Sequence, residues 1–292
     1  MIDSAALAAF AAVLHTGSFE AAAGRLRVTQ SAVSQRVKTL EEALGTTLIR
    51  RTRPATPTDA GRRLLSHAET LGLLERELAR ELAWLAAPRA TPVRIAVTAD
   101  SLATWVLPAL ATVEGLLYDL VIDDQDHSAD LLRAGEVAAA ITASARPVSG
   151  CDALPLGHLR YIAFAAPGFV AAHFAHGVTA EALAAAPALT FNRKDRLQRA
   201  WAEAATGARG PLLTHYLGST HGITEAACAG LGWAVNPDCL IAPLIAEGRL
   251  VDLDPATRIE TPLFWQVPRQ NTAALADLTR ALRRAAPGLR QT

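Results

Sequence analysis

Apolar residues recur at helical spacing through the first 60 residues, in short runs that polar residues and glycines separate. Asp3, Ser18 and Thr29 each precede one of these runs, and their side chains are of the kind that caps a helix amino terminus. Gly17 and Gly45 follow the first and third runs, at the position where glycine often ends a helix. The predicted helices span residues 4 to about 15, 19–26 and 30–44.

The third predicted helix has one apolar and one polar side. Residues spaced by four, three and four positions form a stripe that we expect to be buried: Val33, Val37, Leu40 and Leu44. The opposite side carries Ser31, Ser34, Gln35, Lys38 and Glu42, with Gln30 at the amino end. Short hydroxyl and amide side chains can donate to and accept from base edges in the DNA major groove. A tight turn between two short helices indicates a helix-turn-helix, although an ordinary solvated face would show the same pattern.

An arginine-rich segment after the third helix favours the DNA interpretation. Thr46 to Thr58 reads TTLIRRTRPATPT, which predicts a β-wing that carries cations to the phosphate backbone. Residues 1–66 contain nine arginines and lysines against five acidic residues, a net charge of about +4. Because the whole chain has 28 basic and 28 acidic residues, the neutral total conceals a basic head on an acidic body.

A leucine-rich helix is predicted between Thr58, which can cap it, and Pro88. Its apolar residues recur at helical spacing: Leu64, Ala68, Leu71, Leu74, Leu78, Leu82 and Leu85. A helix running to about Ala86 is a rod roughly 43 Å long. Such a stripe between two globular modules has little core of its own to enter, so we expect a helix of a second copy to cover it. Packing against its own chain is the alternative.

Beyond Pro92 the pattern changes to alternating strands and helices. Compact apolar strands are predicted at 93–97, up to 122 and at 137–142, with helices between them. This βαβαβ order implies a parallel sheet whose ligand edge lies at the carboxyl ends of the strands. A similar unit begins near Leu159, and a last helix at 272–286 returns to the first. Two α/β lobes joined by crossing strands predict a cleft for a small polar ligand.

Polar residues at helix starts and strand ends are the candidates for lining this cleft. A helix amino terminus such as that at Asp100 can hold a carboxylate, and acidic residues can hold an ammonium or guanidinium group. Asn192 and Asp195 follow a strand of the second lobe. The alternative for Ser101, Ser128 and Thr220 is that they only cap helices. The predicted ligand residues are Thr98, Asp100, Ser101, Asp124, Asp126, Asn192, Ser219 and Thr220.

Composition and motifs argue against most other functions. Three scattered cysteines form neither a disulfide framework nor a metal motif. The amino terminus lacks the basic region of a signal peptide, and no apolar run is long enough to span a membrane, so a cytoplasmic protein is expected. Clustered acids at 123–126 leave a metal-dependent hydrolase as one alternative, and an amino-acid carrier as another. No nucleophile elbow, P-loop or dinucleotide fingerprint occurs, so we expect no enzyme, cofactor or metal.

The residues of the head resemble a known family. FEAAAGRLRVTQSAVSQRVKTLEEALGTTLIRR followed by PTDAG resembles the winged helix-turn-helix of LysR-type transcriptional regulators. The order of head, linker helix and two-lobed domain resembles that family along the whole chain. The stretches TQSAVSQRVKTLE, AVTADSLATWVLPAL and DDQDHSADLLRAGEV are similar to its ArgP/LysG branch, whose members sense basic amino acids and activate an exporter.

The resemblance implies a fold and a domain order. We expect an α/β protein with an all-α winged helix-turn-helix head and a two-lobed effector domain like periplasmic binding proteins. The head is expected at 1–58, the linker and dimerisation helix at 59–87, and the effector domain at 93–292. Within the effector domain, lobe I is expected at about 93–158 with 265–292, and lobe II at about 159–264.

It also implies partners and DNA-binding residues. Double-stranded DNA, a lysine or arginine effector, and a homodimer or homotetramer through the linker helix are expected. A regulator of another pathway with a different small effector is the alternative. Ser31 stands where many family members have proline, and the export branch also has serine there. The predicted DNA-binding residues are Thr29, Gln30, Ser31, Ser34, Gln35, Arg36, Lys38, Arg51 and Arg53.

Overall fold

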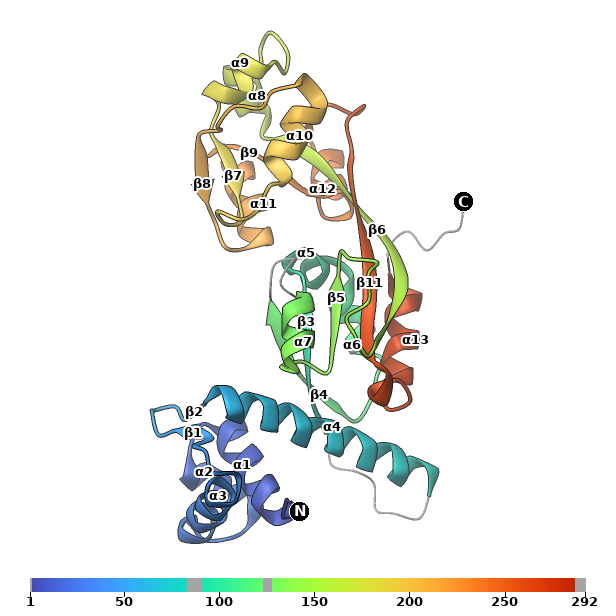
Figure 1. Ribbon diagram of the computed structural model, residues 1–292. Coiled ribbons are helices and arrows are strands. Elements are labelled where there is room, and N and C mark those ends of the chain that lie inside the picture. Colours follow the sequence, from blue (N-terminus) through green and yellow to red (C-terminus); the bar gives the residue numbers. More distant parts are fainter. Residues whose placement is uncertain (1, 83–90, 123–127, 287–292) are drawn as a thin grey trace.

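The computed structural model describes residues 2–82, 91–122 and 128–286. Figure 1 shows a small helical head, a long helix beside it, and two α/β lobes stacked above. The head contains α1 (Ser4–Thr16), α2 (Phe19–Leu26), α3 (Gln30–Leu44) and a wing of β1 (Ile49–Arg50) and β2 (Thr56–Pro57). The strands of the wing pair antiparallel. The predicted combination of a winged helical head and a two-lobed α/β domain is confirmed.

The predicted helix boundaries in the head are confirmed because local caps determine them. The Asp3, Ser18 and Thr29 side chains each accept a hydrogen bond from the backbone N–H three residues on. Gly17 and Gly45 adopt left-handed conformations at the carboxyl ends of their helices. The buried stripe of α3 ends at Leu40, however, because Leu44 lies in the last helical turn and is 41% exposed. The prediction that Leu44 is buried was wrong.

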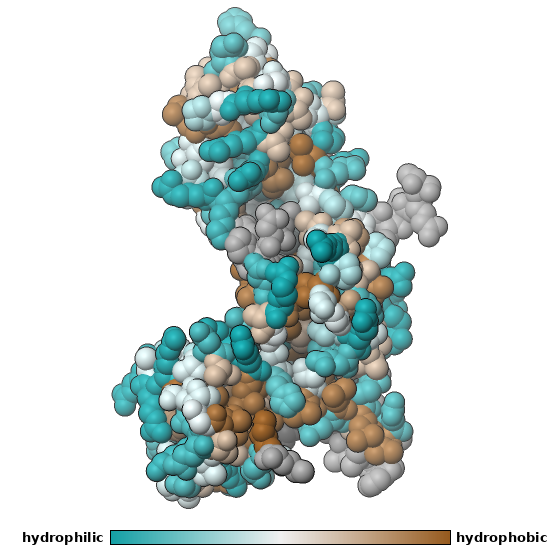
Figure 2. Space-filling view, in the orientation of Figure 1, coloured by the Kyte–Doolittle hydropathy of each residue, from teal (hydrophilic) through white to brown (hydrophobic). Residues whose placement is uncertain are grey.

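Helix α4 (Asp59–Glu81) has two different apolar faces. Leu64 is buried in the core of the head, and Leu73 is buried in the core of the first lobe. On the face opposite Leu73, exposed leucines follow one another: Leu71, Leu74, Leu78 and Leu82. In Figure 2 apolar surface lies along the line of this helix. The predicted continuation of the helix to Leu85 and Ala86 lies outside the described residues.

The face of α4 that carries Leu73 packs on the lobe above it. The Arg76 guanidinium is buried and donates a hydrogen bond to the Glu114 carbonyl at 2.7 Å. The Arg62 guanidinium lies 3.4 Å from the Glu136 carboxylate. Packing against its own chain, the alternative for the leucine stripe, therefore holds for this second face, while Leu71, Leu74, Leu78 and Leu82 stay exposed.

The first lobe contains three parallel strands, β3 (Thr91–Val97), β4 (Leu116–Ile122) and β5 (Ala139–Thr142). A helix follows β3 as α5 (Ala99–Ser101), one π-helical turn (Leu102–Val106) and α6 (Leu107–Leu110), and α7 (Ser128–Ala134) precedes β5. The predicted parallel arrangement is thus confirmed. The last helix, α13 (Ala276–Ala285), covers this lobe but begins later than predicted. A 3₁₀ turn (Arg269–Asn271) precedes it, and there the buried Asn271 side chain donates to the Ala138 carbonyl.

Two long antiparallel strands, β6 (Cys151–Ala165) and β11 (Ile259–Pro268), cross between the lobes. The second lobe adds four strands: β7 (Ala188–Thr190), β8 (Thr214–Tyr216), β9 (Trp233–Pro237) and β10 (Val251–Asp252). Its helices are α8 (Pro167–His173), α9 (Ala180–Ala185), α10 (Leu197–Thr206), α11 (Thr220–Cys228) and α12 (Asp238–Ala246). Within the described residues, the strands of both lobes form one sheet in the order β4-β3-β5-β11-β6-β9-β7-β8, with β10 beside β6.

Three fully buried tryptophans, Trp201, Trp233 and Trp265, anchor the core that continues through both lobes. Trp201 and Trp233 lie against each other with ring centroids 5.6 Å apart. In the described part of the chain, none of the helices has the length and apolar character needed to cross a membrane.

Candidate DNA interface and effector cleft

The predicted base-reading residues lie together on the outer side of α3. Gln30, Ser31 and Gln35 are exposed, and Ser34 is half-buried. Thr29 caps the helix, and its hydroxyl lies 3.0 Å from that of Ser31. The polar side chains of the helix are therefore available to a partner that approaches α3 from outside.

The basic residues of the head differ in their surroundings. Lys38 is exposed, but its amino group lies 3.6 Å from the Glu42 carboxylate, so it already forms an ion pair within the head. Arg36 is half-buried. On the wing, Arg51 and Arg53 are exposed, and no ion pair joins either one to an acid of the described residues. The wing arginines therefore keep their N–H donors free for an external anion.

Hydrogen bonds hold the wing against the helices. The Glu41 carboxylate at the end of α3 accepts from the backbone N–H groups of Leu48 and Ile49 at 2.7 and 3.2 Å. At the other side of the wing, the Ala55 N–H donates to the Gly17 carbonyl at 2.8 Å. Glu41 was not predicted to have a structural role, because an acid seven residues before its partner has no characteristic spacing. It fixes the wing relative to the reading helix.

Arg51 also contacts the second helix. Its guanidinium carbon lies 5.2 Å from the centroid of the Phe19 ring, the first residue of α2. A guanidinium at this distance over an aromatic face is attracted by the ring quadrupole. Phe19 was predicted only as the start of a helix, since nothing in the sequence relates it to a residue 32 positions later.

A second candidate site centres on Asp100, where the two lobes meet. The Asp100 carboxylate accepts a hydrogen bond from the Thr220 hydroxyl at 2.8 Å and one from the Tyr161 hydroxyl at 3.0 Å. Asp100 lies in the first turn of the first-lobe helix, Tyr161 lies on the crossing strand β6, and Thr220 is the first residue of α11. One carboxylate thus joins lobe I, the crossing strand and lobe II.

The environment of Asp100 disfavours its negative charge. Burial raises the pKa of this carboxyl above its ordinary value, and the negative charge of Asp195 raises it further. The hydrogen bonds from Thr220 and Tyr161 lower the pKa, but by less than burial raises it. A cation placed beside Asp100 would compensate the charge, because an opposite charge favours the ionised form.

Several other predicted cleft residues serve as helix caps. The buried Thr98 hydroxyl accepts from the Ser101 N–H at 3.2 Å and donates to the Ser101 hydroxyl at 2.8 Å. The Ser219 hydroxyl accepts from the Gly222 N–H at 3.1 Å. Thr98 and Ser219 are thus the caps, and the capping alternative for Ser101 and Thr220 was wrong. The Ser101 hydroxyl accepts from Thr98, and the Thr220 hydroxyl donates to Asp100. Asp124 and Asp126 lie outside the described residues.

The second lobe contributes a small, open polar hollow. It lies beside the loop in which the Asn192 side chain accepts from the backbone N–H groups of Lys194 and Asp195. Gln198 is 2% exposed, and its Oε1 has no hydrogen-bond partner among the described residues. The lining residues are Thr190, Asn192, Arg193, Asp195, Gln198, Arg199, Leu212, Thr214 and Tyr216. Tyr161 was not predicted because it stands in an apolar strand, and Gln198 was not predicted because it stands among charged residues typical of a solvated surface.

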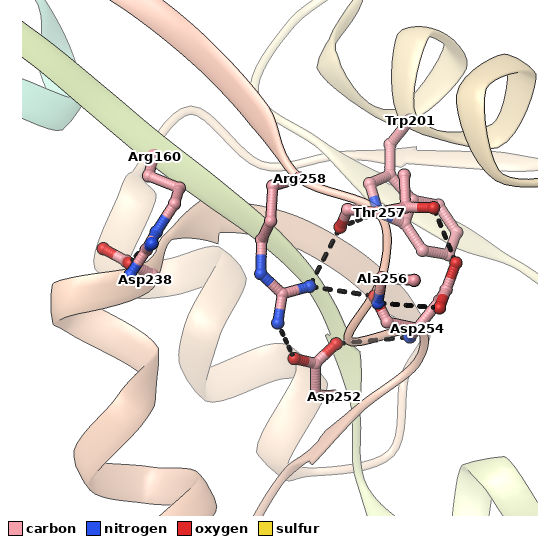
Figure 3. A network of polar contacts seen from close by, with 8 residues as sticks. All are labelled: Arg160, Trp201, Asp238, Asp252, Asp254, Ala256, Thr257 and Arg258. Carbon is pink, nitrogen blue, oxygen red and sulfur yellow. Dashed lines mark hydrogen bonds and ion pairs between the residues drawn. The ribbon is translucent and has the colours of Figure 1, made fainter.

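A polar network fixes the lobe II ends of the crossing strands (Figure 3). The Arg258 guanidinium, just before β11, lies 2.6 Å from the Asp252 carboxylate. Arg160 on β6 lies equally close to Asp238 at the start of α12, and this hydrogen bond raises the pKa of Arg160. The Asp254 carboxylate accepts from the Thr257 hydroxyl at 2.6 Å, which lowers the pKa of Asp254. These pairs join the crossing strands to lobe II independently of Asp100.

In the part of the chain that the structure describes, no three histidine, cysteine or acidic side chains gather into a group that could hold a metal ion. Cys151, Cys228 and Cys239 are free thiols, and burial is the main cause that raises the pKa of each. Neither observation points to metal binding or thiol chemistry at the two candidate sites.

Comparison with known proteins assigns both parts of the chain. Residues 4–62 match the family described as bacterial regulatory helix-turn-helix protein, lysR family. Residues 86–287 match the LysR substrate binding domain. Together the two matches cover the head and both lobes, and most of α4 lies between them.

Individual relatives extend over the full length. The HTH-type transcriptional regulator LysG of Mycobacterium tuberculosis is 43% identical over 288 residues, which is 99% of this chain and 95% of that protein. ArgP of Pseudomonas aeruginosa is 42% identical over 296 residues, with 99% and 98% covered. The crystal structure of ArgP from Mycobacterium tuberculosis matches with a TM-score of 0.79 at 42% identity, covering 99% and 98%. Full-length LysG of Corynebacterium glutamicum with bound effector Arg matches with a TM-score of 0.63 at 35% identity, covering 97% and 98%.

Proposed function

The chain belongs to the LysR family and is a DNA-binding transcriptional regulator, and from this premise we propose that its effector is a basic amino acid, arginine or lysine. We propose further that it controls an amino-acid exporter gene as an activator, as the similarity to the ArgP/LysG branch implies. The observation that carries the effector proposal is the Asp100 carboxylate, which both lobes and the crossing strand hold at one point.

The charge at the cleft supports a cationic ligand. Burial is the main cause that raises the pKa of Asp100, and the negative charge of Asp195 adds to it. A guanidinium or ammonium group beside Asp100 would offset this cost. The Corynebacterium glutamicum relative has Arg as its bound effector, which is consistent with this chemistry.

The polar groups around these acids suggest how the rest of the ligand is held. Gln198 offers a buried acceptor, and Arg199 offers donors to a carboxylate. Thr220 and Asn192 stand at the lobe II side, and Thr98, Ser101 and Ser219 hold the helix starts in place. A ligand that contacts lobe I and lobe II together favours the arrangement of the two lobes that it binds most tightly.

For DNA binding, we propose that α3 lies in the major groove and that the wing follows the phosphate backbone. Thr29, Gln30, Ser31, Ser34 and Gln35 are assigned to the bases and to the helix start. Arg36, Lys38, Arg51 and Arg53 are assigned to phosphates. The exposure of the reading side of α3 and the unpaired wing arginines support this division.

We propose that two copies pair through the exposed leucines of α4. Four large apolar side chains on one side of a helix otherwise remain in water, and a second helix of the same kind would cover them. The resulting homodimer, or a homotetramer built from two dimers, would place two heads on neighbouring half-sites. We accordingly place the head at 1–58, the linker helix at 59–87 and the effector domain at 93–292. Within the effector domain, the chain passes between lobe I and lobe II near residues 158 and 265.

No observation on the described residues favours the hydrolase alternative, and we assign the protein no catalytic role and no cofactor. Its place of action is the cytoplasm, since that is where a bacterial regulator meets chromosomal DNA.

The DNA assignment is tested by fluorescence anisotropy with labelled duplexes over a series of salt concentrations. Arg51→Ala should weaken binding to every duplex and flatten the salt dependence, because a lost phosphate contact releases fewer counterions. Gln35→Ala should instead reduce discrimination between sequences, by about 1–3 kcal/mol if the contact is bidentate. Glu81→Gln, at the far end of α4, is the control. Full affinity and unchanged sequence preference in Gln35→Ala would refute the assignment of the reading side.

A further inference from the structure

The Arg51 guanidinium lies over the Phe19 ring, with its central carbon 5.2 Å from the ring centroid, and no ion pair joins it to an acid of the described residues. Phe19 is half-buried and packs on the core of the head, so its ring has a fixed position. Arg51 itself is exposed. A rigid aromatic face therefore lies under a long, otherwise free, cationic side chain.

A ring is a different kind of partner from a carboxylate. An acid beside an arginine accepts from the N–H groups and occupies the donors that a phosphate needs. An aromatic ring contacts the flat face of the guanidinium and leaves its edge, which carries all five N–H donors, free. Lys38 shows the contrast within the same head, because Glu42 lies beside its amino group.

The backbone under Arg51 is already fixed. Glu41 holds Leu48 and Ile49 just before it, and the Gly17 carbonyl holds Ala55 after it. The remaining freedom is that of the side chain itself, and ordering a long arginine side chain costs conformational entropy. A contact that orders it before DNA arrives removes part of this cost from binding.

We propose that Phe19 is a positioning residue for DNA binding: its ring holds the Arg51 guanidinium with its donor edge turned outward to a backbone phosphate. The proposal rests on the proposed contact between Arg51 and a phosphate. It assigns Phe19 a role beyond its place in the core of the head.

A double-mutant cycle separates this role from a purely structural one. The full-length protein binds a labelled mixed-sequence duplex of about 30 base pairs, long enough for two half-sites one helical turn apart. Phe19→Leu and Phe19→Met remove the ring, Phe19→Tyr retains it, and each is combined with Arg51→Ala and with Arg53→Ala. Using two ring-free variants keeps the test valid if one of them fails to fold.

Phe19→Leu and Phe19→Met are expected to weaken binding about two- to fivefold, the range that corresponds to an exposed cation–π contact. Phe19→Tyr should bind like the wild type. In the Arg51→Ala background the loss of the ring should have no further effect. In the Arg53→Ala background it should still cost the same two- to fivefold factor.

Equal losses in the wild-type and Arg51→Ala backgrounds would overturn the proposal, since Phe19 would then act through the fold alone. Equal binding by all Phe19 variants would overturn it as well. If Arg51→Ala leaves both affinity and salt dependence unchanged, the phosphate contact itself fails, and the positioning role fails with it. This last outcome is distinguishable, because it appears in the single Arg51 variant.

Discussion

Gly61 occupies a position where the structure has no room for a side chain. It lies in the first turn of α4, and a Cβ built on it would stand 2.1 Å from the Leu48 carbonyl oxygen. Gly24, in the exposed part of α2, has nothing within 4 Å of the same added atom. Alanine is a better helix former than glycine by about 1 kcal/mol at either site. The two substitutions should therefore change the stability of the head with opposite signs.

The cost at Gly61 follows from what the Leu48 carbonyl does. To relieve the overlap it must move by roughly 1 Å, and overpacking of this kind costs about 1–3 kcal/mol. The same oxygen accepts from the Thr58 N–H and hydroxyl at 3.0 and 3.3 Å, and each hydrogen bond contributes about 0.5–1.5 kcal/mol. After the gain in helix propensity, Gly61→Ala should destabilise the head by about 1–5 kcal/mol. Gly24→Ala should stabilise it by up to about 1 kcal/mol.

The assay can follow the head separately from the lobes. All five tryptophans stand at or beyond residue 84, so tryptophan fluorescence reports on the rest of the chain. Far-ultraviolet circular dichroism includes the helices of the head. Gly61→Ala should lower the urea concentration at which the head unfolds, as followed by circular dichroism, and leave the fluorescence transition unchanged. It should also weaken DNA binding, because Leu48 lies just before the first strand of the wing. Equal stability of the Gly61→Ala and Gly24→Ala proteins would refute the packing argument.

Two further predictions concern assembly and the cleft. The double variant Leu71→Glu, Leu78→Glu should separate the two copies, since a carboxylate is costly to bury against leucine. Light scattering measures the mass, and the double variant Glu75→Gln, Glu81→Gln is the control. An unchanged oligomer would contradict the pairing. Asp100→Asn should raise the thermal midpoint of the ligand-free protein at neutral pH. The pKa of the Asp100 carboxyl is raised in the folded protein, so ionisation of this group lowers the free energy of unfolding as the pH rises, and asparagine removes that loss. The same variant should bind arginine and lysine roughly ten- to a hundredfold more weakly; a lower midpoint or unchanged affinity would count against the assigned role.

The predictable parts of this molecule are those that neighbouring residues determine. Asp3, Ser18 and Thr29 cap helices from three residues away, so their helices start where the sequence indicates. The leucine stripe of α4 followed from periodicity alone. The exposure of Leu44 did not follow from periodicity, because whether the last turn of a helix is covered depends on elements elsewhere in the fold.

The site contacts that escaped prediction join residues far apart in the sequence. Tyr161 reaches Asp100 across 61 positions, and Thr220 reaches it across 120. Thr220 and Asp100 were predicted as separate candidates from strand and helix ends, yet their direct hydrogen bond was not. Tyr161 stands in an apolar strand, where its ring is core and only its hydroxyl belongs to the site. Such pairings depend on how the lobes meet, which no local pattern encodes.

Calorimetric titration of the full-length protein with arginine, lysine and leucine tests the proposed effector most directly. The charge at Asp100 and Asp195 predicts saturable binding of arginine or lysine and none of leucine. Leucine has the same α-amino and α-carboxyl groups but no distant cation, so it isolates the contribution of the side-chain charge. Leucine binding as tightly as the basic amino acids, or no binding of arginine and lysine, would contradict the effector assignment.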